Sequence, residues 1–180
     1  MTDAAESFLK HAVARMQAVK ALGDGVLSQV TQDELFRQTD PEANSIAIIV
    51  RHLHGNMLSR WTDFLASDGE KESRKRDLEF EQPEQSLESV RSLWESGWKC
   101  TLDAIGGLQA GDVLKLVEIR GQPLSVMEAI MRQLAHYSYH TGQMVTLARE
   151  QLGARWQTLS IARGKSKDYV PRQRAGGIKE

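Results

Sequence analysis

Histidines supply the most evident chemistry in this 180-residue sequence. His136 and His140 are four residues apart in the run His136-Tyr137-Ser138-Tyr139-His140. On a helix their imidazoles would lie about 40° apart around the axis and one turn apart along it, so both could point at one metal ion. The same spacing also suits two histidines at the border of an apolar stripe. The run is not the HExxH of a zinc protease, because Tyr137 stands where that chemistry needs a glutamate base.

A metal site needs a further ligand, and His52 or His54 could supply it. The apolar stripe of residues 44–67 places His54 about 60° from its centre and His52 about 140° from it, on a polar flank. Periodicity therefore favours His54 as the buried histidine. A ligand that lines a solvent-open cleft between helices would instead lie on the polar flank, so both residues stay open as candidates. His11 stands alone and is interpreted as a border or surface residue.

The elements that would position these histidines are helices. Four stretches show the three- and four-residue apolar spacing of amphipathic helices, and we expect Gly23 and Gly25 to weaken the end of the first. Ser125 with Glu128 three residues later is a capping box and predicts where the last helix begins. The predicted helices cover about residues 4–30, 44–67, 86–108 and 125–152.

The segments outside these helices differ in character. Residues 68–83 carry many charges without an apolar period, so they are predicted to form a long, solvated loop. The alternation from Val113 to Ile119, followed by Arg120-Gly121-Gln122, predicts a short hairpin. The sequence thus predicts an all-α fold with a helical domain over residues 1–155, a hairpin before its last helix, and a partly extended C-terminal arm over residues 156–180.

Composition excludes several classes of protein. The net charge of −1 and the 41% of apolar residues are typical of a soluble globular domain. No basic excess indicates a nucleic-acid partner, and no stretch approaches the roughly 18–20 apolar residues of a membrane span. The N-terminal residues lack the pattern of a signal peptide, and the one cysteine, Cys100, cannot form an internal disulfide. We therefore expect a cytoplasmic protein with no nucleic acid and no membrane among its partners.

The order of these motifs resembles a known family. A long helix with a central histidine, a further helix, a hairpin and then His-x-x-x-His-x-Gly-Gln is similar to the DinB-like, or YfiT-like, metalloprotein superfamily and, within it, to the DUF1572 group. Tyr139 departs from the many superfamily members that carry two adjacent histidines before the Gly-Gln. The segments similar to the DUF1572 group are residues 44–77, 93–99, 118–144 and 159–166.

The resemblance implies an up-down-down-up four-helix bundle that holds one divalent ion. By position, the ligands carried over are His52, His136 and His140, with His52 in the segment that matches the family's central histidine. Zinc is the metal we expect first, with nickel or iron as alternatives. The family also tends to form homodimers.

Characterised relatives use the ion to activate a low-molecular-weight thiol, as in bacillithiol S-transferases and the mycothiol-dependent maleylpyruvate isomerase. The resemblance therefore implies a metal-dependent thiol S-transferase or isomerase with a small-molecule substrate. The alternative is a noncatalytic, dimeric, metal-binding or stress-associated protein whose ion mainly fixes the bundle. A basic pocket beside the ion would favour the enzyme, and the arginines considered for it are Arg51, Arg60, Arg120 and Arg132.

Polar residues near the candidate ligands could have supporting roles. Asn56 and Gln143 each follow a candidate ligand by about one helical turn, so either could orient a ligand or a bound water. Metal-dependent hydrolysis would need a carboxylate base at the ion, and Asp63 and Glu128 lie too many turns away along their helices to serve.

Overall fold

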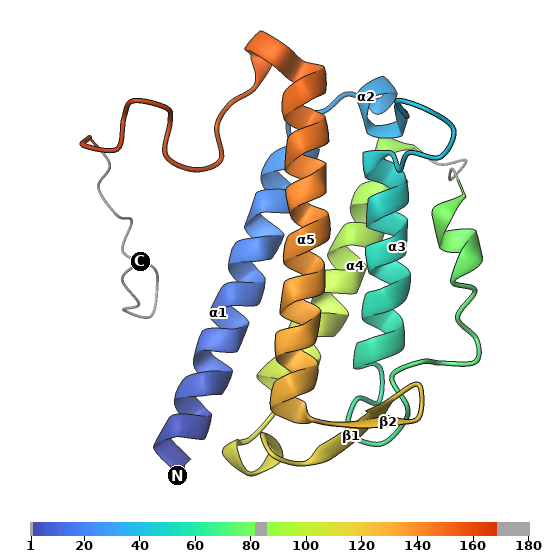
Figure 1. The fold of residues 1–180 in the computed structure, drawn as a ribbon, viewed down its shortest axis with the longest axis vertical. Coiled ribbons are helices and arrows are strands. Elements are labelled where there is room, and N and C mark those ends of the chain that lie inside the picture. The colour runs from blue at the N-terminus through green and yellow to red at the C-terminus, as the bar shows by residue number, and fades with distance from the viewer. Residues whose placement is uncertain (1, 82–85, 169–180) are drawn as a thin grey trace.

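The computed structural model describes residues 2–81 and 86–168, and within them the chain is mostly helical (Figure 1). Long helices lie side by side, a short helix connects the first two of them, and a hairpin precedes the last. The predicted helical class, with its short hairpin, is confirmed. The elements are α1 (Thr2–Leu27), α2 (Gln32–Phe36), α3 (Ile46–Trp61), α4 (Leu87–Gly106), β1 (Leu116–Ile119), β2 (Gln122–Ser125) and α5 (Val126–Leu152), with short 3-10 turns η1 (Asp77–Phe80), η2 (Ala110–Asp112) and η3 (Gly153–Arg155).

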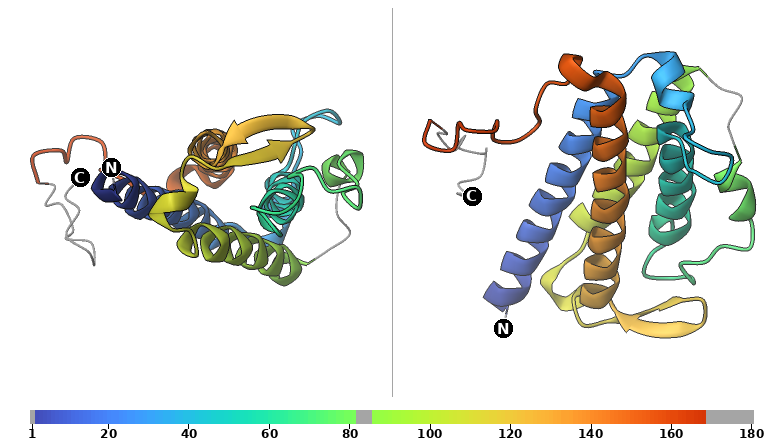
Figure 2. Two further views of the ribbon diagram at one scale, coloured as in Figure 1. Left: turned by 90° about the horizontal axis from the view of Figure 1, so that it is seen from below. Right: turned by 45° about the horizontal axis from the view of Figure 1, so that its top comes forward.

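The long helices pack around one apolar core. In Figure 1, α1 and α5 run upward while α3 and α4 run downward, and the end-on view in Figure 2 separates the four helix axes. Helix α3 packs against α4 and α5, and α1 packs against α4 and α5. Met16, Leu53, Trp98 and Tyr137, one from each long helix, are fully buried where these faces meet. Burial of these apolar faces is the main contribution to the stability of the packed helices.

Hydroxyl caps set where the helices begin. The Ser45 Oγ atom accepts a hydrogen bond from the Ile48 N–H at 3.2 Å, which starts α3. Ser125 and Glu128 form the predicted capping box at the start of α5. A second capping box, Thr31 with Glu34, begins the short helix α2, which the apolar spacing did not predict. Such a five-residue helix is too short to show a period.

Two helices end earlier than predicted. Helix α1 stops at Leu27 and α3 at Trp61. Helix α1 continues through Gly23 and Gly25 before it ends. A Cβ atom at Gly23 would lie 2.1 Å from the Trp94 ring, so the missing side chain makes room for that ring. The Trp94 Nε1–H then donates to Asp24 at 2.7 Å.

The prediction that residues 68–83 are solvated is wrong for part of the segment. Residues 68–81 fold back along α3, and the side chains of Arg74 and Glu79 are only 4% and 8% exposed. Their opposite charges pair with each other, so a charge-rich sequence here marks a buried ion pair. Periodicity could not show this, because the partner that buries these charges is α3 and not a neighbour in sequence.

The hairpin is confirmed, although β1 begins at Leu116 and not at Val113. Arg120 and Gly121 form its turn with φ angles of 57° and 66°, the left-handed region that two-residue hairpin turns use. The Asp68 carboxylate accepts the N–H groups of both turn residues, at 2.9 and 2.7 Å. This contact ties the hairpin to the loop that follows α3.

The C-terminal segment lies beyond the last long helix. Residues 156–168 contain neither helix nor strand, and the Gln157 N–H donates to Gln29, in the turn after α1, at 2.8 Å. Residues 169–180 of the predicted arm lie outside the described residues, so the boundary after residue 155 stays a prediction. Among the helices of the described residues, none is both long and apolar enough to cross a membrane.

Candidate metal centre

His52 is buried although it lies on the polar flank of α3. Its side chain is 6% exposed, its ring lies 4.7 Å from the Phe80 ring, and its Nδ1 atom is 2.9 Å from Glu79. The η1 turn thus covers the flank that the sequence predicts to be open. His54 is half-buried and packs against Gly97 of α4. The structure therefore places His52, and not His54, toward α5.

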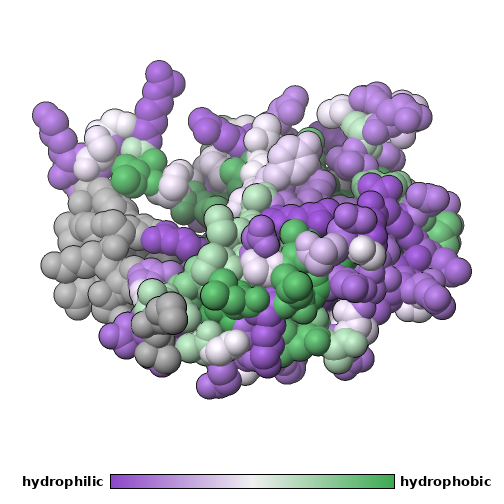
Figure 3. Space-filling model, turned by 60° about the horizontal axis from the view of Figure 1, so that its bottom comes forward, coloured by the Kyte–Doolittle hydropathy of each residue, from purple (hydrophilic) through white to green (hydrophobic). Residues whose placement is uncertain are grey.

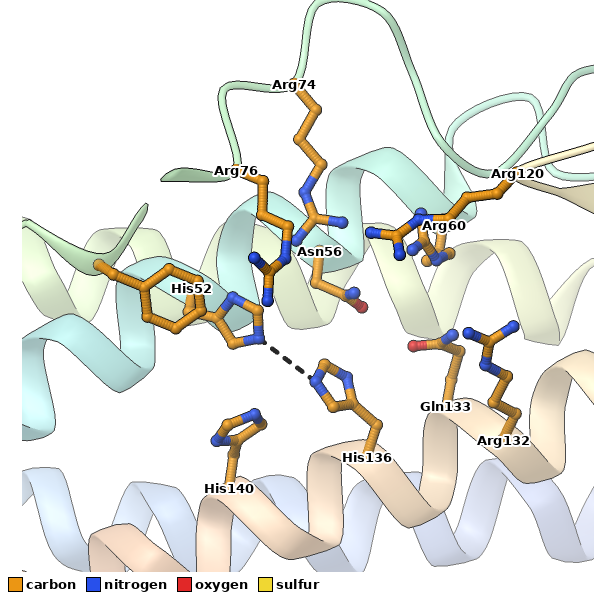
Figure 4. A pocket seen from close by; sticks show the side chains of 11 residues that line it. His52, Asn56, Arg60, Arg74, Arg76, Arg120, Arg132, Gln133, His136 and His140 are labelled. Carbon is orange, nitrogen blue, oxygen red and sulfur yellow. Dashed lines mark hydrogen bonds between the residues drawn. The ribbon is translucent and has the colours of Figure 1, made fainter. Parts of the chain in front are cut away.

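His52, His136 and His140 meet between α3 and α5 (Figure 4). The Nε2 atoms of His52 and His136 are 3.3 Å apart, and one nitrogen of each histidine lies within 4.8 Å of the others. Tetrahedral zinc with Zn–N bonds of about 2.0–2.1 Å separates its ligand nitrogens by about 3.3–3.4 Å. The separation of His52 and His136 therefore matches that of two ligands on one small ion, and His140 lies beside them. His11 is exposed on α1 and lies outside the cluster.

Hydrogen bonds at Nδ1 orient the imidazoles of His52 and His140. Glu79 accepts the Nδ1–H of His52, and the Gln143 Oε1 atom accepts the Nδ1–H of His140 at 2.8 Å. In each ring Nε2 then carries the lone pair that a metal ion would bind. In this structure the His52 lone pair accepts a hydrogen bond from the His136 Nε2–H. The Tyr139 hydroxyl in turn accepts from Gln143 at 3.1 Å. Gln143 therefore takes the orienting position predicted for it, and Tyr139 supports it.

Asn56 has a different partner from the one considered for it. It is buried and lines the pocket, but its Oδ1 atom accepts the Tyr137 hydroxyl at 3.1 Å. The Trp61 Nε1–H donates to the same hydroxyl at 2.9 Å. Asn56 thus fixes the core beneath His136 and makes no hydrogen bond to a histidine of the cluster.

Glu79 is held in place by Arg74 and by a glycine. Arg74 donates to both carboxylate oxygens, at 2.7 and 2.8 Å. Burial alone would raise the pKa of Glu79, but the hydrogen bonds from Arg74 and His52 outweigh it and lower the pKa. A Cβ atom on Gly55 would lie 2.2 Å from the Glu79 carboxylate, so only glycine allows this approach.

Sequence reasoning missed Glu79, Arg74 and Gly55. Nothing in the charged segment distinguishes Glu79 from its acidic neighbours. The available signal was Gly55, a glycine inside a strongly apolar helix, because such a residue usually marks a close approach.

The histidines of α5 are neutral at physiological pH. Burial, followed by the charges of His140 and His52, lowers the pKa of His136 to about 3. Burial also lowers the pKa of His140, although its bond to Gln143 acts in the opposite direction. Neutral imidazole is the form that binds metals, so these residues need not lose a proton first.

A cavity of about 400 Å³ opens beside the histidines. Among the described residues, no carboxylate lines it, so the hydrolysis hypothesis lacks its base. Of the four candidate arginines, Arg51 lies outside this cavity and bonds to the Glu81 carbonyl oxygen at 3.4 Å. The lining residues are His52, Asn56, Arg60, Arg74, Arg76, Phe80, Arg120, Arg132, Gln133, His136 and His140 (Figure 4).

A solved structure and a family model show which known proteins this chain resembles. A solved structure of a DinB-like protein from Bacillus cereus ATCC 10987 superposes with a TM-score of 0.58 at 16% sequence identity, and the match covers 81% of this chain and 91% of that one. The fold is therefore DinB-like. The family model described as a protein of unknown function, DUF1572, matches residues 3–165, so the chain belongs to the DUF1572 family. Among curated proteins, none matches the chain.

Proposed function

We propose that the protein binds one divalent metal ion through His52, His136 and His140. The observation that carries the proposal is the cluster itself, whose nitrogens lie within 4.8 Å of one another. Glu79 and Gln143 hold two of the rings by their Nδ1 atoms, as outer-shell partners of metal-bound histidines do. Nitrogen ligands suit zinc first and nickel or ferrous iron next. The chain directions of α1, α3, α4 and α5 support the up-down-down-up bundle that the resemblance implies.

The pocket favours an enzyme over a structural metal site. A closed structural site surrounds its ion with protein ligands, whereas three histidines leave a position for water or substrate. We propose a metal-dependent thiol S-transferase or isomerase. When bound, the ion lowers the pKa of a thiol and so supplies a thiolate nucleophile. The arginines beside the histidines would hold the carboxylates of such a thiol, and the absence of a lining carboxylate among the described residues fits a nucleophile brought by the substrate.

In the noncatalytic alternative, the protein binds the ion but catalyses no thiol transfer or isomerisation. In that case the arginine-lined cavity would have no ligand to bind. Arginines gathered around one cavity repel one another, and only some of them are paired with carboxylates, so their arrangement supports a role in binding an anion.

Metal content tests the first step of the proposal. Elemental analysis of untagged protein should find about one ion per chain, the stoichiometry of a single three-histidine site. Folded protein whose metal content stayed near zero after supplementation would contradict the site.

Thiol conjugation tests the second step. Cysteine, glutathione, bacillithiol and mycothiol are each offered with 1-chloro-2,4-dinitrobenzene. The sulfur–carbon bond forms as chloride and a proton leave, and the product absorbs light. We expect the metal-loaded protein to accelerate the reaction of one thiol and the His140→Ala variant to lose that acceleration. Equal rates with loaded protein, variant and buffer would favour the noncatalytic alternative.

We also propose that the protein is a homodimer in the cytoplasm. Large apolar side chains are exposed at the end that carries the hairpin, where Figure 3 shows hydrophobic atoms interrupting the polar surface. Leu114, Leu116 and Met131 are 76%, 71% and 57% exposed. Light scattering after gel filtration should give twice the mass of the chain, and a monomer mass at all concentrations would reject the dimer.

A further inference from the structure

Polar groups without partners gather at one end of the cavity. Helices α3 and α5 run in opposite directions, so Arg60 faces Arg132 and Gln133 much as His52 faces His136 and His140 (Figure 4). Gln133 is 3% exposed, and its Oε1 atom accepts no hydrogen bond from any described residue. A buried carbonyl oxygen is normally paired, so its position on the cavity wall indicates a donor that comes from a ligand.

The same end of the cavity carries excess positive charge. The Glu70 carboxylate is shared, because it accepts from Arg60 at 2.9 Å, from Arg120 at 2.9 Å and from Arg74 at 3.4 Å. The Nε atom of Arg60 is buried without a partner, and Arg132 lines the cavity with no hydrogen bond or ion pair within residues 2–81 and 86–168. Glu79 balances the charge of Arg74, so Glu70 is left to balance both Arg60 and Arg120. With Arg132, this end of the cavity carries more guanidinium groups than carboxylates, which favours a ligand that brings negative charge.

We propose that this end of the cavity is an oxyanion subsite for a small organic ligand. Arg132, with Arg120 and Arg60, binds a carboxylate or phosphate, since guanidinium groups pair with both through charge-assisted hydrogen bonds. A hydroxyl or N–H group next to that anion donates to the Gln133 Oε1 atom. The cavity of about 400 Å³ has the size of a small-molecule site. The inference rests on the proposed function, because the ligand would extend from this subsite toward the ion. The residues that form the subsite do not include the proposed metal ligands.

Calorimetric titration of the full chain tests the subsite with matched probes. Glutarate and 2-hydroxyglutarate differ by one hydroxyl group, and glycerol 3-phosphate offers a phosphate in place of a carboxylate. We expect 2-hydroxyglutarate to bind about five- to tenfold more tightly than glutarate, the effect of one added hydrogen bond, and Gln133→Leu to abolish this preference. The tighter of 2-hydroxyglutarate and glycerol 3-phosphate identifies the anionic group.

Arginine variants provide the second arm of the test. Arg132 is exposed, so Arg132→Gln should fold normally, and it should weaken the binding of the tightest probe about tenfold or more through loss of a charged hydrogen bond. Arg149→Gln, on the same helix but outside the cavity, should bind like the wild type. Failure of all three probes to bind would overturn the subsite, and so would wild-type affinity in both Arg132→Gln and Gln133→Leu.

A metal-site variant separates this inference from the proposed function. His140→Ala removes a proposed ligand at the other end of the cavity. Its affinity for the tightest probe should stay within about threefold of wild type, because water and salt screen the effect of a distant ion. In the wild-type protein, probe binding without any bound metal would leave the subsite standing and reject the ion. Wild-type protein with about one metal ion per chain and no probe binding would support the ion and reject the subsite.

Discussion

At the scale of single residues, we expect substitution of His52 and substitution of His54 to have different effects on metal binding. His52→Ala should weaken metal binding about as much as His136→Ala or His140→Ala, since each removes one proposed ligand from the ion. His54→Ala should leave it unchanged, because His54 packs toward Gly97 on the side of α4. A bound ion stabilises the native state according to the ratio of its concentration to its dissociation constant, so thermal shift with and without zinc measures each variant.

The outcome distinguishes the two interpretations of α3. The zinc-induced shift should persist in His54→Ala and vanish in the other variants. If His52→Ala kept the full shift and His54→Ala lost it, the apolar spacing of α3 would have identified the ligand correctly.

A second prediction concerns Gly55, which binds nothing itself. Gly55→Ala adds a methyl group that collides with the Glu79 carboxylate, and Glu79 must then release His52 or Arg74. Zinc affinity should fall about 10-fold or more, as it does when outer-shell partners of metal-bound histidines are changed. Competition with a chromogenic chelator gives the affinity.

Gly142→Ala is the matched control. A Cβ atom at Gly142 meets nothing within 4 Å, although the residue lies two positions from His140. Zinc affinity should therefore be unchanged, and the free energy of unfolding should rise by up to about 1 kcal/mol from helix propensity. Equal losses of affinity in both variants would show that Glu79 does not position His52.

A third prediction follows from the pKa of His136. Its folded value of about 3 lies below the unfolded value of 6.5, so the unfolded state binds the proton first as the pH falls. The chelator-treated protein should lose stability below the unfolded pKa, and the loss should grow until the folded pKa is reached. His136→Gln cannot take up this proton and should show a smaller loss between about pH 7 and pH 4 in urea melts. Identical pH profiles would refute the assignment.

At the scale of elements, Asp68 joins the loop after α3 to the hairpin. Its carboxylate accepts backbone N–H groups from Glu70, Gly121 and Arg120, and the bonds from Glu70 and Gly121 contribute most to its lowered pKa. Asp68→Ala should reduce the free energy of unfolding by about 1–3 kcal/mol, because the N–H groups lose a charged acceptor. In the wild type this contribution is present above the unfolded pKa of the carboxyl and is lost as the pH falls through the folded pKa.

Asp77→Ala provides the comparison, since the Asp77 side chain is fully exposed and its nearest charge, on Arg76, is 3.9 Å away. Its stability in urea should change by less than about 0.5 kcal/mol. A similar effect of both substitutions would mean that Asp68 does not anchor the hairpin.

Some helices could be predicted from the sequence alone, whereas the burial of His52 could not. Helices with an apolar stripe and a capping residue, such as α5 with Ser125, were predictable because both signals are local. The burial of His52 was not, because η1 covers it from 27 residues away in the chain. A helical wheel assigns a flank to solvent when only its own residues are considered, and Glu79 could be found only once the loop was placed in space.

At the scale of the whole molecule, resemblance supplied what periodicity left open. The order of histidine, hairpin and His-x-x-x-His-x-Gly-Gln indicated the DinB-like fold and favoured His52 over His54. The arginine-lined end of the cavity required the structure, because Arg60, Arg120 and Arg132 come from α3, the hairpin turn and α5. Residues so far apart in sequence leave no shared pattern to detect.

The distance along the chain between the histidines has a kinetic consequence. His52 and His136 are separated by 84 residues, so an ion between them closes a long loop that exists only once α3 and α5 have docked. If that docking follows the rate-limiting step, zinc should slow unfolding and leave the refolding rate nearly unchanged. Stopped-flow measurements in urea with and without zinc would show this as a shift of the unfolding limb alone, whereas faster refolding would mean that the histidines already meet in the transition state. A shift of the unfolding limb alone would mean that the ion binds after folding is complete. The ion would then lengthen the lifetime of the folded chain without helping it to fold.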